Sequence, residues 1–156
     1  MRILYLIPFC LLLICFSPVS AQTSGEEEVK SAIRQLFDGM RKGDSAMVKD
    51  VFDVKAVLQT IAQPSGGVAE VRTVSLEKFL TAVGAPHTDV WDERIAFDKI
   101  LIDGDLASVW TPYRFYVGDR FSHCGVNSFQ LVKSQKGWKI VYLIDTRRKD
   151  NCLNTD

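Results

Sequence analysis

The chain is poor in the residues that most catalytic and metal motifs require. Its 156 residues include only two histidines and four cysteines, and its basic and acidic residues balance at 19 each. A zero net charge argues against a dedicated nucleic-acid-binding protein, which normally carries a basic excess. The sequence has no glycine-rich phosphate loop, serine nucleophile elbow or metal-ligand spacing, so it indicates neither a cofactor nor a metal. Its length predicts one domain.

The longest apolar run lies at the N-terminus. Residues 3–16 carry no charge and follow Met1-Arg2, and Val19-Ser20-Ala21 offers small residues before Gln22. This order is typical of a secretory signal peptide cleaved after Ala21. A membrane anchor is the alternative, but the run is shorter than the roughly 20 residues of a span; lipid attachment at Cys15 is another. We therefore expect a signal peptide over 1–21, a secreted or periplasmic chain over 22–156, and no membrane contact after cleavage.

Signal cleavage would leave two cysteines, Cys124 and Cys152. An exported protein meets an oxidising environment, which favours a disulfide between them. The alternative is a pair of free thiols, one of them catalytic. His123 is badly placed to activate Cys124, because neighbouring residues in a strand point to opposite faces.

Apolar periodicity predicts three helices in the first half of the mature chain. The first follows the capping box Ser24-Gly25-Glu26-Glu27 and ends near Gly43. Asp44 or Ser45 begins a short second helix, and Ser75 caps the third. The apolar stripes on these helices predict faces that pack on a core.

Apart from these helices, the mature chain is predicted to form mainly strands. Residues 54–62 and 68–74 predict a hairpin before the third helix. Residues 90–102 predict one long strand whose apolar parity slips, which indicates a β-bulge near Asp98-Lys99. Three further strands, over 106–117, 120–133 and 138–147, complete an antiparallel meander. Helices followed by a meander predict an α+β domain.

A strongly curved sheet wrapped over helices encloses a cone, and alternation predicts which side chains face into it. The expected inward sets include Trp138, Ile140, Tyr142 and Ile144 in the last strand, and Ala107, Val109, Thr111, Tyr113 and Phe115 in the strand from 106. The polar inward residues are Glu93, Tyr113, His123 and Asn127. Asp145, Arg147 and Arg148 are expected at a solvated strand end, and Trp91, Trp110 and Trp138 in the core.

Several motifs resemble the nuclear transport factor 2-like, or SnoaL-like, superfamily. Ile102-Asp103-Gly104-Asp105-Leu106-Ala107 is similar to its turn before a strand, and Gly137-Trp138-Lys139-Ile140 to an element of its last strand. The segments Val109–Tyr116, Phe121–Phe129 and Asp145–Arg148 resemble small exported bacterial members described as lumazine-binding. The resemblance implies a cone-like α+β fold with three helices on a curved, mainly antiparallel sheet of about six strands. It implies no particular activity, because the superfamily hosts isomerases, dehydratases, cyclases, hydrolases and binding modules.

These features favour an exported protein that binds a small apolar or cyclic ligand. The expected ligand-binding residues are Trp91, Glu93, Tyr113, His123 and Asn127. One alternative is an isomerase, dehydratase or hydrolase in which His123 is the acid or base and Glu93 or Tyr113 its partner. A histidine that only fixes strand register is the structural explanation for His123. The other alternative is a non-catalytic module that forms a homodimer through an exposed sheet face.

Overall fold

The computed structural model describes residues 19–62, 67–153 and 155, so most of the expected signal peptide and the tip of the first hairpin lie outside the described residues. The helices are α1 (Val19–Lys42), α2 (Ser45–Asp50) and α3 (Leu76–Gly84). The strands are β1 (Phe52–Ala62), β2 (Glu70–Val74), β3 (Trp91–Ile95), β4 (Lys99–Asp103), β5 (Leu106–Val117), β6 (Arg120–Ser134) and β7 (Gly137–Thr146). Among the described helices, none has the length and apolarity needed to cross a membrane.

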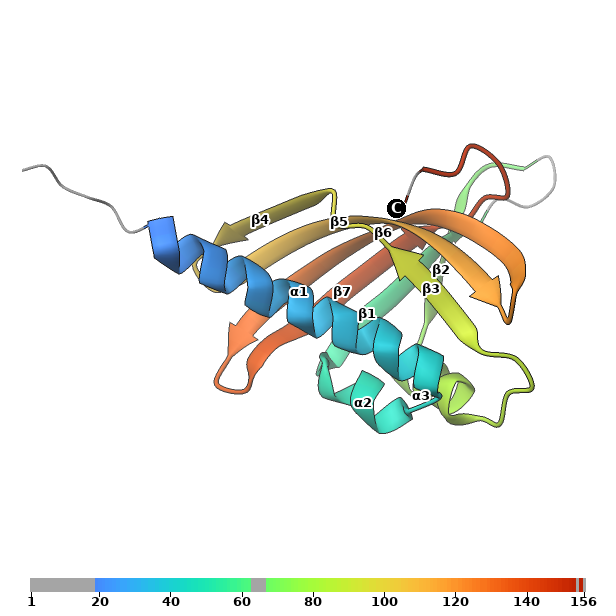
Figure 1. The fold of residues 1–156 in the computed structure, drawn as a ribbon, viewed down its shortest axis with the longest axis horizontal. Coiled ribbons are helices and arrows are strands. Elements are labelled where there is room, and N and C mark those ends of the chain that lie inside the picture. Colours follow the sequence, from blue (N-terminus) through green and yellow to red (C-terminus); the bar gives the residue numbers. More distant parts are fainter. Residues whose placement is uncertain (1–18, 63–66, 154, 156) are drawn as a thin grey trace, which may run out of the picture.

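All seven strands belong to one sheet of order β2-β1-β7-β6-β5-β3, with β4 also paired to β5. The β1–β7 pair is parallel and the other pairs are antiparallel. The helix α1 lies along one face of this curved sheet, and α2 and α3 gather near its C-terminal end (Figure 1). The α+β cone predicted from the sequence is therefore confirmed, with seven strands in place of about six.

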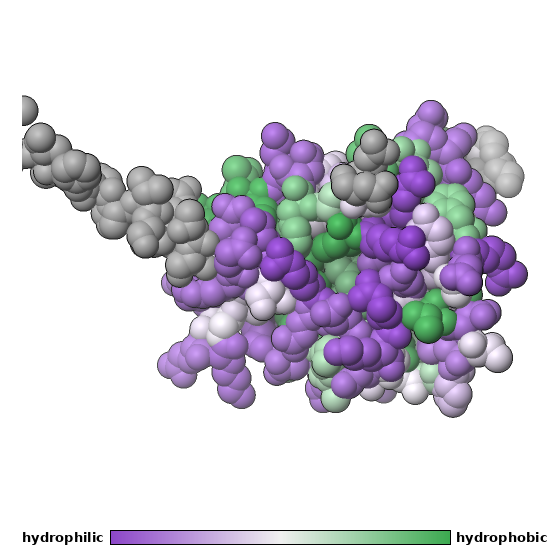
Figure 2. All heavy atoms as spheres, viewed as in Figure 1, coloured by the Kyte–Doolittle hydropathy of each residue, from purple (hydrophilic) through white to green (hydrophobic). Residues whose placement is uncertain are grey.

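The helix α1 packs its apolar stripe against the sheet. Ile33, Leu36 and Phe37 are buried, and the Phe37 ring meets the edge of Phe129 from β6 at 6.2 Å between centroids. The face of the molecule over α1 is mainly hydrophilic, as expected for an amphipathic helix (Figure 2). The predicted cap at Ser24 is wrong, because α1 begins at Val19. No glycine or proline lies between 19 and 24, so nothing in that stretch stops the helix.

The predicted strand over 90–102 is divided into β3 and β4. Both pair with β5, and Ile95 lies opposite Tyr113 while Lys99 lies opposite Trp110. Residues 96–98 therefore lie opposite only residues 111 and 112 of β5. The one extra residue produces the parity slip seen in the sequence. The slip was placed correctly, but it takes the form of a break over 96–98, not a bulge in a continuous strand.

A second slip, which the sequence analysis did not predict, occurs in β7. Leu131 pairs with Ile140, but the preceding residue of β6, Gln130, pairs with Tyr142. Val141 is thus an extra residue, and an extra residue exchanges the two faces of a strand. Trp138 and Ile140 are buried as predicted.

Beyond this bulge the predicted inward positions of Tyr142 and Ile144 are wrong. Leu143 packs on the core, and Asp145 is 9% exposed. Trp110 also departs from prediction, because it is 44% exposed on the opposite face of β5 from Val109.

The C-terminal segment is fastened to β6. A disulfide joins Cys124 to Cys152, as the sequence analysis favoured. The backbone amides of Cys124 and Arg148 each donate to the carbonyl of the other at 2.8 Å. These links hold the chain beyond β7 beside the end of β6 that carries His123.

Candidate functional site

The concave side of the sheet encloses a cavity of about 280 Å³ between α1, α3 and the sheet. Most of its wall is apolar and comes from all three of these parts: Leu36, Phe37 and Met40 of α1, Phe79 and Ala82 of α3, and Leu58, Val74, Trp91, Phe115 and Leu143 of the strands. Gln59, Thr60 and Lys78 also line it. A volume at the lower end of ordinary ligand pockets suits a small molecule.

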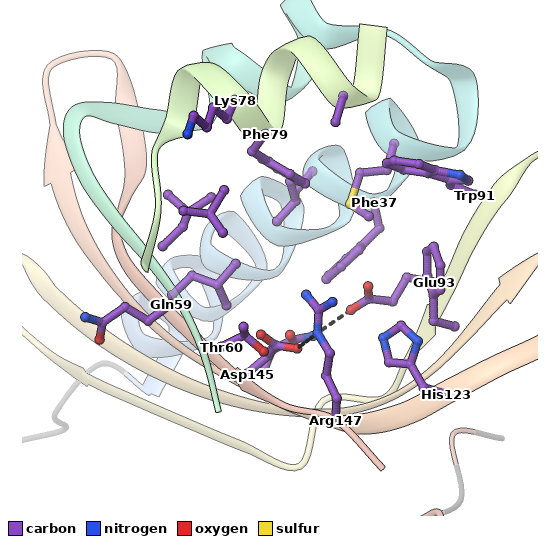
Figure 3. Close-up of a pocket in the computed structure, with 18 residues that line it drawn as sticks. Phe37, Gln59, Thr60, Lys78, Phe79, Trp91, Glu93, His123, Asp145 and Arg147 are labelled. Carbon is purple, nitrogen blue, oxygen red and sulfur yellow. Dashed lines mark hydrogen bonds and ion pairs between the residues drawn. The ribbon is translucent and has the colours of Figure 1, made fainter. Parts of the chain in front are cut away.

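One end of the cavity is polar. Glu93 reaches it from β3, His123 from β6, Asp145 from β7 and Arg147 from just beyond β7 (Figure 3). Asn127 of β6 lines the same end. Of the expected ligand-binding residues, Trp91, Glu93, His123 and Asn127 line this cavity. The alternation rule brings these four together because β6 keeps one register against β5 from Leu131 to His123. The shift in this pairing, between Phe115 and Tyr116, falls beyond His123.

Among the described residues, the carboxyl group of Glu93 has one hydrogen-bond partner and no ion-pair partner. Its Oε1 accepts a hydrogen bond from Nδ2 of Asn127 at 2.8 Å, and Asn127 is only 4% exposed. Burial raises the pKa of the Glu93 carboxyl to about 7, and the negative charge of Asp145 adds to that rise. Glu93 is therefore able to gain or lose a proton near neutral pH.

Asp145 has more partners. Its Oδ2 accepts from the Tyr113 hydroxyl at 3.1 Å and from Nε of Arg147 at 2.8 Å. The same Tyr113 hydroxyl lies 2.9 Å from the carbonyl oxygen of Thr146. The sequence-based expectation of a solvated strand end is thus wrong for Asp145, which the bulge at Val141 turns into the cavity, whereas Arg147 is both exposed and in contact with the cavity.

Tyr113 does not line the cavity. It is 2% exposed, and its hydroxyl is occupied by Asp145 and the Thr146 carbonyl. Burial and the neighbouring Asp145 raise the pKa of this hydroxyl well above its usual value. Tyr113 therefore acts in this structure as a support for Asp145, and unlike the other four expected ligand-binding residues it is not part of the cavity wall.

His123 stands between aromatic rings at the polar end. Its ring centroid lies 5.1 Å from that of Phe115 and 5.7 Å from that of Tyr113. Nδ1 is 3.0 Å from the hydroxyl of Ser122. Burial lowers the pKa of His123, and the positive charge of Arg147 lowers it further. The neutral imidazole is thus the favoured form at neutral pH.

The sequence analysis missed Asp145, Arg147 and the helix residues of the wall. The signal that could have located the first two was present: Val141 and Leu143 are apolar at positions expected to face solvent. Thr60 was missed as well. Its hydroxyl oxygen is buried and has no hydrogen-bond partner among the residues that the structure describes. Across the described ranges, no group of three or more His, Cys, Asp or Glu side chains could hold a metal ion.

A family model described as "Putative lumazine-binding" matches residues 24–143. The chain belongs to this family. The match covers α1 from residue 24 onward, α2, α3, the strands β1 to β6, and β7 as far as Leu143. No curated protein shows a significant match to the chain.

Solved structures support the same fold. A nuclear transport factor 2-like protein of unknown function from Shewanella baltica is 14% identical with a TM-score of 0.63, covering 86% of this chain and 100% of its own. One with a cystatin-like fold from Novosphingobium aromaticivorans is 10% identical with a TM-score of 0.67, covering 81% and 84%. A conserved protein from Planctomyces limnophilus is 15% identical with a TM-score of 0.67, covering 81% and 98%. At such identities the likeness shows the fold alone, which is the fold that the sequence motifs implied.

Proposed function

We propose that this protein binds a small, flat cyclic molecule in the cavity of its cone. The observation that carries the proposal is the division of the cavity into a wall of apolar and aromatic side chains and one polar end. Such a division buries a ring while a few polar groups fix its orientation. The description of the family supports a small ring compound, because lumazine is a flat bicyclic molecule with a polar edge.

Export of the protein is part of the proposal. A disulfide and the lack of a membrane-spanning helix in the described residues are compatible with a location outside the cytoplasm. Cleavage after Ala21 would remove three residues from α1, which begins at Val19, and leave Ser24 near the new helix start. Mass spectrometry of the protein from its native host should then find Gln22 as the first residue; an intact N-terminus would contradict export by cleavage.

Filling the cavity tests the binding proposal. Ala82 of α3 lines the cavity, so Ala82→Phe places a ring inside it. Ala46 of α2 is exposed, so Ala46→Phe makes the same substitution outside the cavity. Lumazine binding can be followed by the fluorescence of Trp91, which also lines the cavity.

We expect the Ala82→Phe variant to bind lumazine about tenfold more weakly or worse, which corresponds to about 1.4 kcal/mol. The Ala46→Phe variant should bind as the wild type does. Circular dichroism would establish that both variants are folded. Equal binding by both variants would refute this cavity as the ligand site, and no binding by the wild type would refute lumazine-like rings as ligands.

An isomerase, dehydratase or hydrolase is the second candidate. It is favoured by the Glu93 carboxyl, whose pKa of about 7 suits proton transfer at neutral pH, and by the presence of His123 at the same end. Proton exchange on a cyclic ketone in deuterated water, followed by NMR, tests this candidate. His123→Ala should abolish exchange with little change in melting temperature if the imidazole is catalytic. A lowered melting temperature with unchanged exchange would assign His123 a structural role.

A further inference from the structure

The two carboxyl groups at the polar end of the cavity differ in the hydrogen-bond and ion-pair partners that the protein supplies to them. Asp145 accepts from Tyr113 and is paired with Arg147, at 3.1 and 2.8 Å. Glu93 accepts only from Asn127, at 2.8 Å. Within the part of the chain that the structure describes, no Lys, Arg or His nitrogen forms an ion pair with Glu93. A carboxyl group has two oxygens and about four acceptor sites, so Glu93 retains acceptor capacity that the protein does not use.

This capacity lies where a ligand can reach it. Glu93 lines the cavity beside Asn127, and Figure 3 shows its carboxyl group pointing toward the centre of the polar end. Asn127 is nearly fully buried, and its amide donates to Oε1, so it holds the carboxyl group in this direction. Glu93 is half-buried, and an acceptor that faces a mostly apolar cavity gains from a ligand that supplies a donor.

The charges at this end also restrict the ligand. Arg147 is the one cation that forms an ion pair with a carboxyl group of the polar end in the described structure, and Asp145 occupies its Nε. At this end an anionic ligand would approach Glu93 and Asp145 with only this one, already paired, guanidinium to compensate for them, because Lys78, the other cation that lines the cavity, lies on α3 away from the polar end (Figure 3). A neutral or cationic molecule with N–H groups meets no such repulsion.

The apolar wall adds a requirement of shape. Phe37 and Phe79 line the cavity on the helix side, and Trp91 and Phe115 line it on the sheet side, with 6.3 Å between the centroids of the last two rings. Aromatic walls favour a flat ring over a branched or flexible chain. Resting on the proposed binding function, we propose that the preferred ligands are flat nitrogen heterocycles that present an amino group beside a ring N–H to Glu93.

A matched pair of ligands tests this inference. Pterin and lumazine share one bicyclic skeleton, and in pterin an amino group replaces one of the two carbonyl oxygens of lumazine. Pterin therefore offers a ring N–H and an amino group side by side. Isothermal titration of the wild type at a pH above the pKa of about 7 of the Glu93 carboxyl, where this group is ionised, should show tighter binding of pterin by about tenfold or more, as expected for a hydrogen bond to a charged acceptor.

Two variants assign the preference to Glu93. Glu93→Gln keeps an oxygen for Asn127 but removes the charge, and it should bind the two compounds within about twofold of each other. Asp92→Asn makes the same charge change on the neighbouring residue of β3, whose carboxyl group pairs with Arg41 and Arg94 away from the cavity. This control should keep the preference of the wild type.

The outcomes separate the inference from the proposed function. A wild type that binds lumazine as tightly as pterin, or a Glu93→Gln variant that keeps the preference, overturns the role of Glu93 and leaves the binding function standing. A wild type that binds neither compound overturns both. Loss of the preference in Asp92→Asn would show that net charge, and not a contact with Glu93, selects the ligand.

Discussion

Replacing Glu93 by glutamine should change how the stability of the protein depends on pH. The carboxyl group is held beside Asn127 at the polar end of the cavity, and burial raises its pKa from 4.5 to about 7. Glutamine keeps the shape of the side chain and an oxygen that can accept from Asn127, but it cannot ionise. The substitution therefore isolates the cost of ionising this one buried group.

The sign and size of the effect follow from the two pKa values. Between pH 4.5 and about 7 the folded state holds a proton that the unfolded state has lost, so stability decreases as pH rises through this window. The full change for a pKa raised this far is about 3.4 kcal/mol. About 2.5 kcal/mol of it falls between about pH 5 and about pH 8.

Urea unfolding of both proteins across this pH range measures the difference. The free energy of unfolding of the Glu93→Gln variant, relative to the wild type, should rise by about 2.5 kcal/mol from about pH 5 to about pH 8. His123, Asp145 and Arg147 surround the same site, but they are present in both proteins, so their own titrations largely cancel in the difference. Parallel curves for the two proteins would refute burial of an ionisable Glu93.

Three further substitutions test the framework of the fold. Cys152→Ser removes the disulfide to Cys124, whose sequence separation is 28, and should lower the free energy of unfolding by about 3.6 kcal/mol in the chain-entropy model; an unchanged urea midpoint would contradict this. Gly125→Ala would place a Cβ 1.8 Å from the Thr146 carbonyl oxygen and should lower stability by about 1–3 kcal/mol. In the full chain, Gly25→Ala in α1, where the new Cβ would lie 3.8 Å from Cδ1 of Ile102, should instead raise stability by about 0.5–1 kcal/mol, and the same urea titration compares the two.

Local rules predicted those parts of the fold that depend on neighbours in the sequence. Ser75 caps α3 through its hydroxyl, which accepts from the amide of Lys78, and Asp44 caps α2 in the same way. Gly43 adopts a φ of +66°, as its predicted place after a helix requires. The inward set of β5 was also correct, because this strand keeps one alternation from Ala107 to Phe115.

Asp145 and Arg147, which the sequence analysis missed, enter the site because of how two strands pair, and the pattern within one strand does not determine that pairing. The extra residue at Val141 is defined by the pairing of β7 with β6, where Gln130 and Leu131 skip one residue of the partner strand. The apolar residues on both faces of β7 fit either parity, so the sequence pattern alone could not choose between them. The pairing of β7 with its parallel partner β1 is irregular at the same place, between Phe52 and Val57.

This bulge determines the chemistry of the cavity. Without it, Tyr142 and Ile144 would face the cone, and the end beside Glu93 would be lined by an apolar strand with no second carboxyl group. With it, Asp145 enters the cavity together with Arg147, and the hydroxyl of Tyr113 below them is bound by Asp145 and is no longer available to a ligand. Because Asp145 neutralises Arg147, Glu93 is left as the carboxyl group without a cationic partner among the described residues, and the selectivity proposed for this cavity depends on that separation of roles.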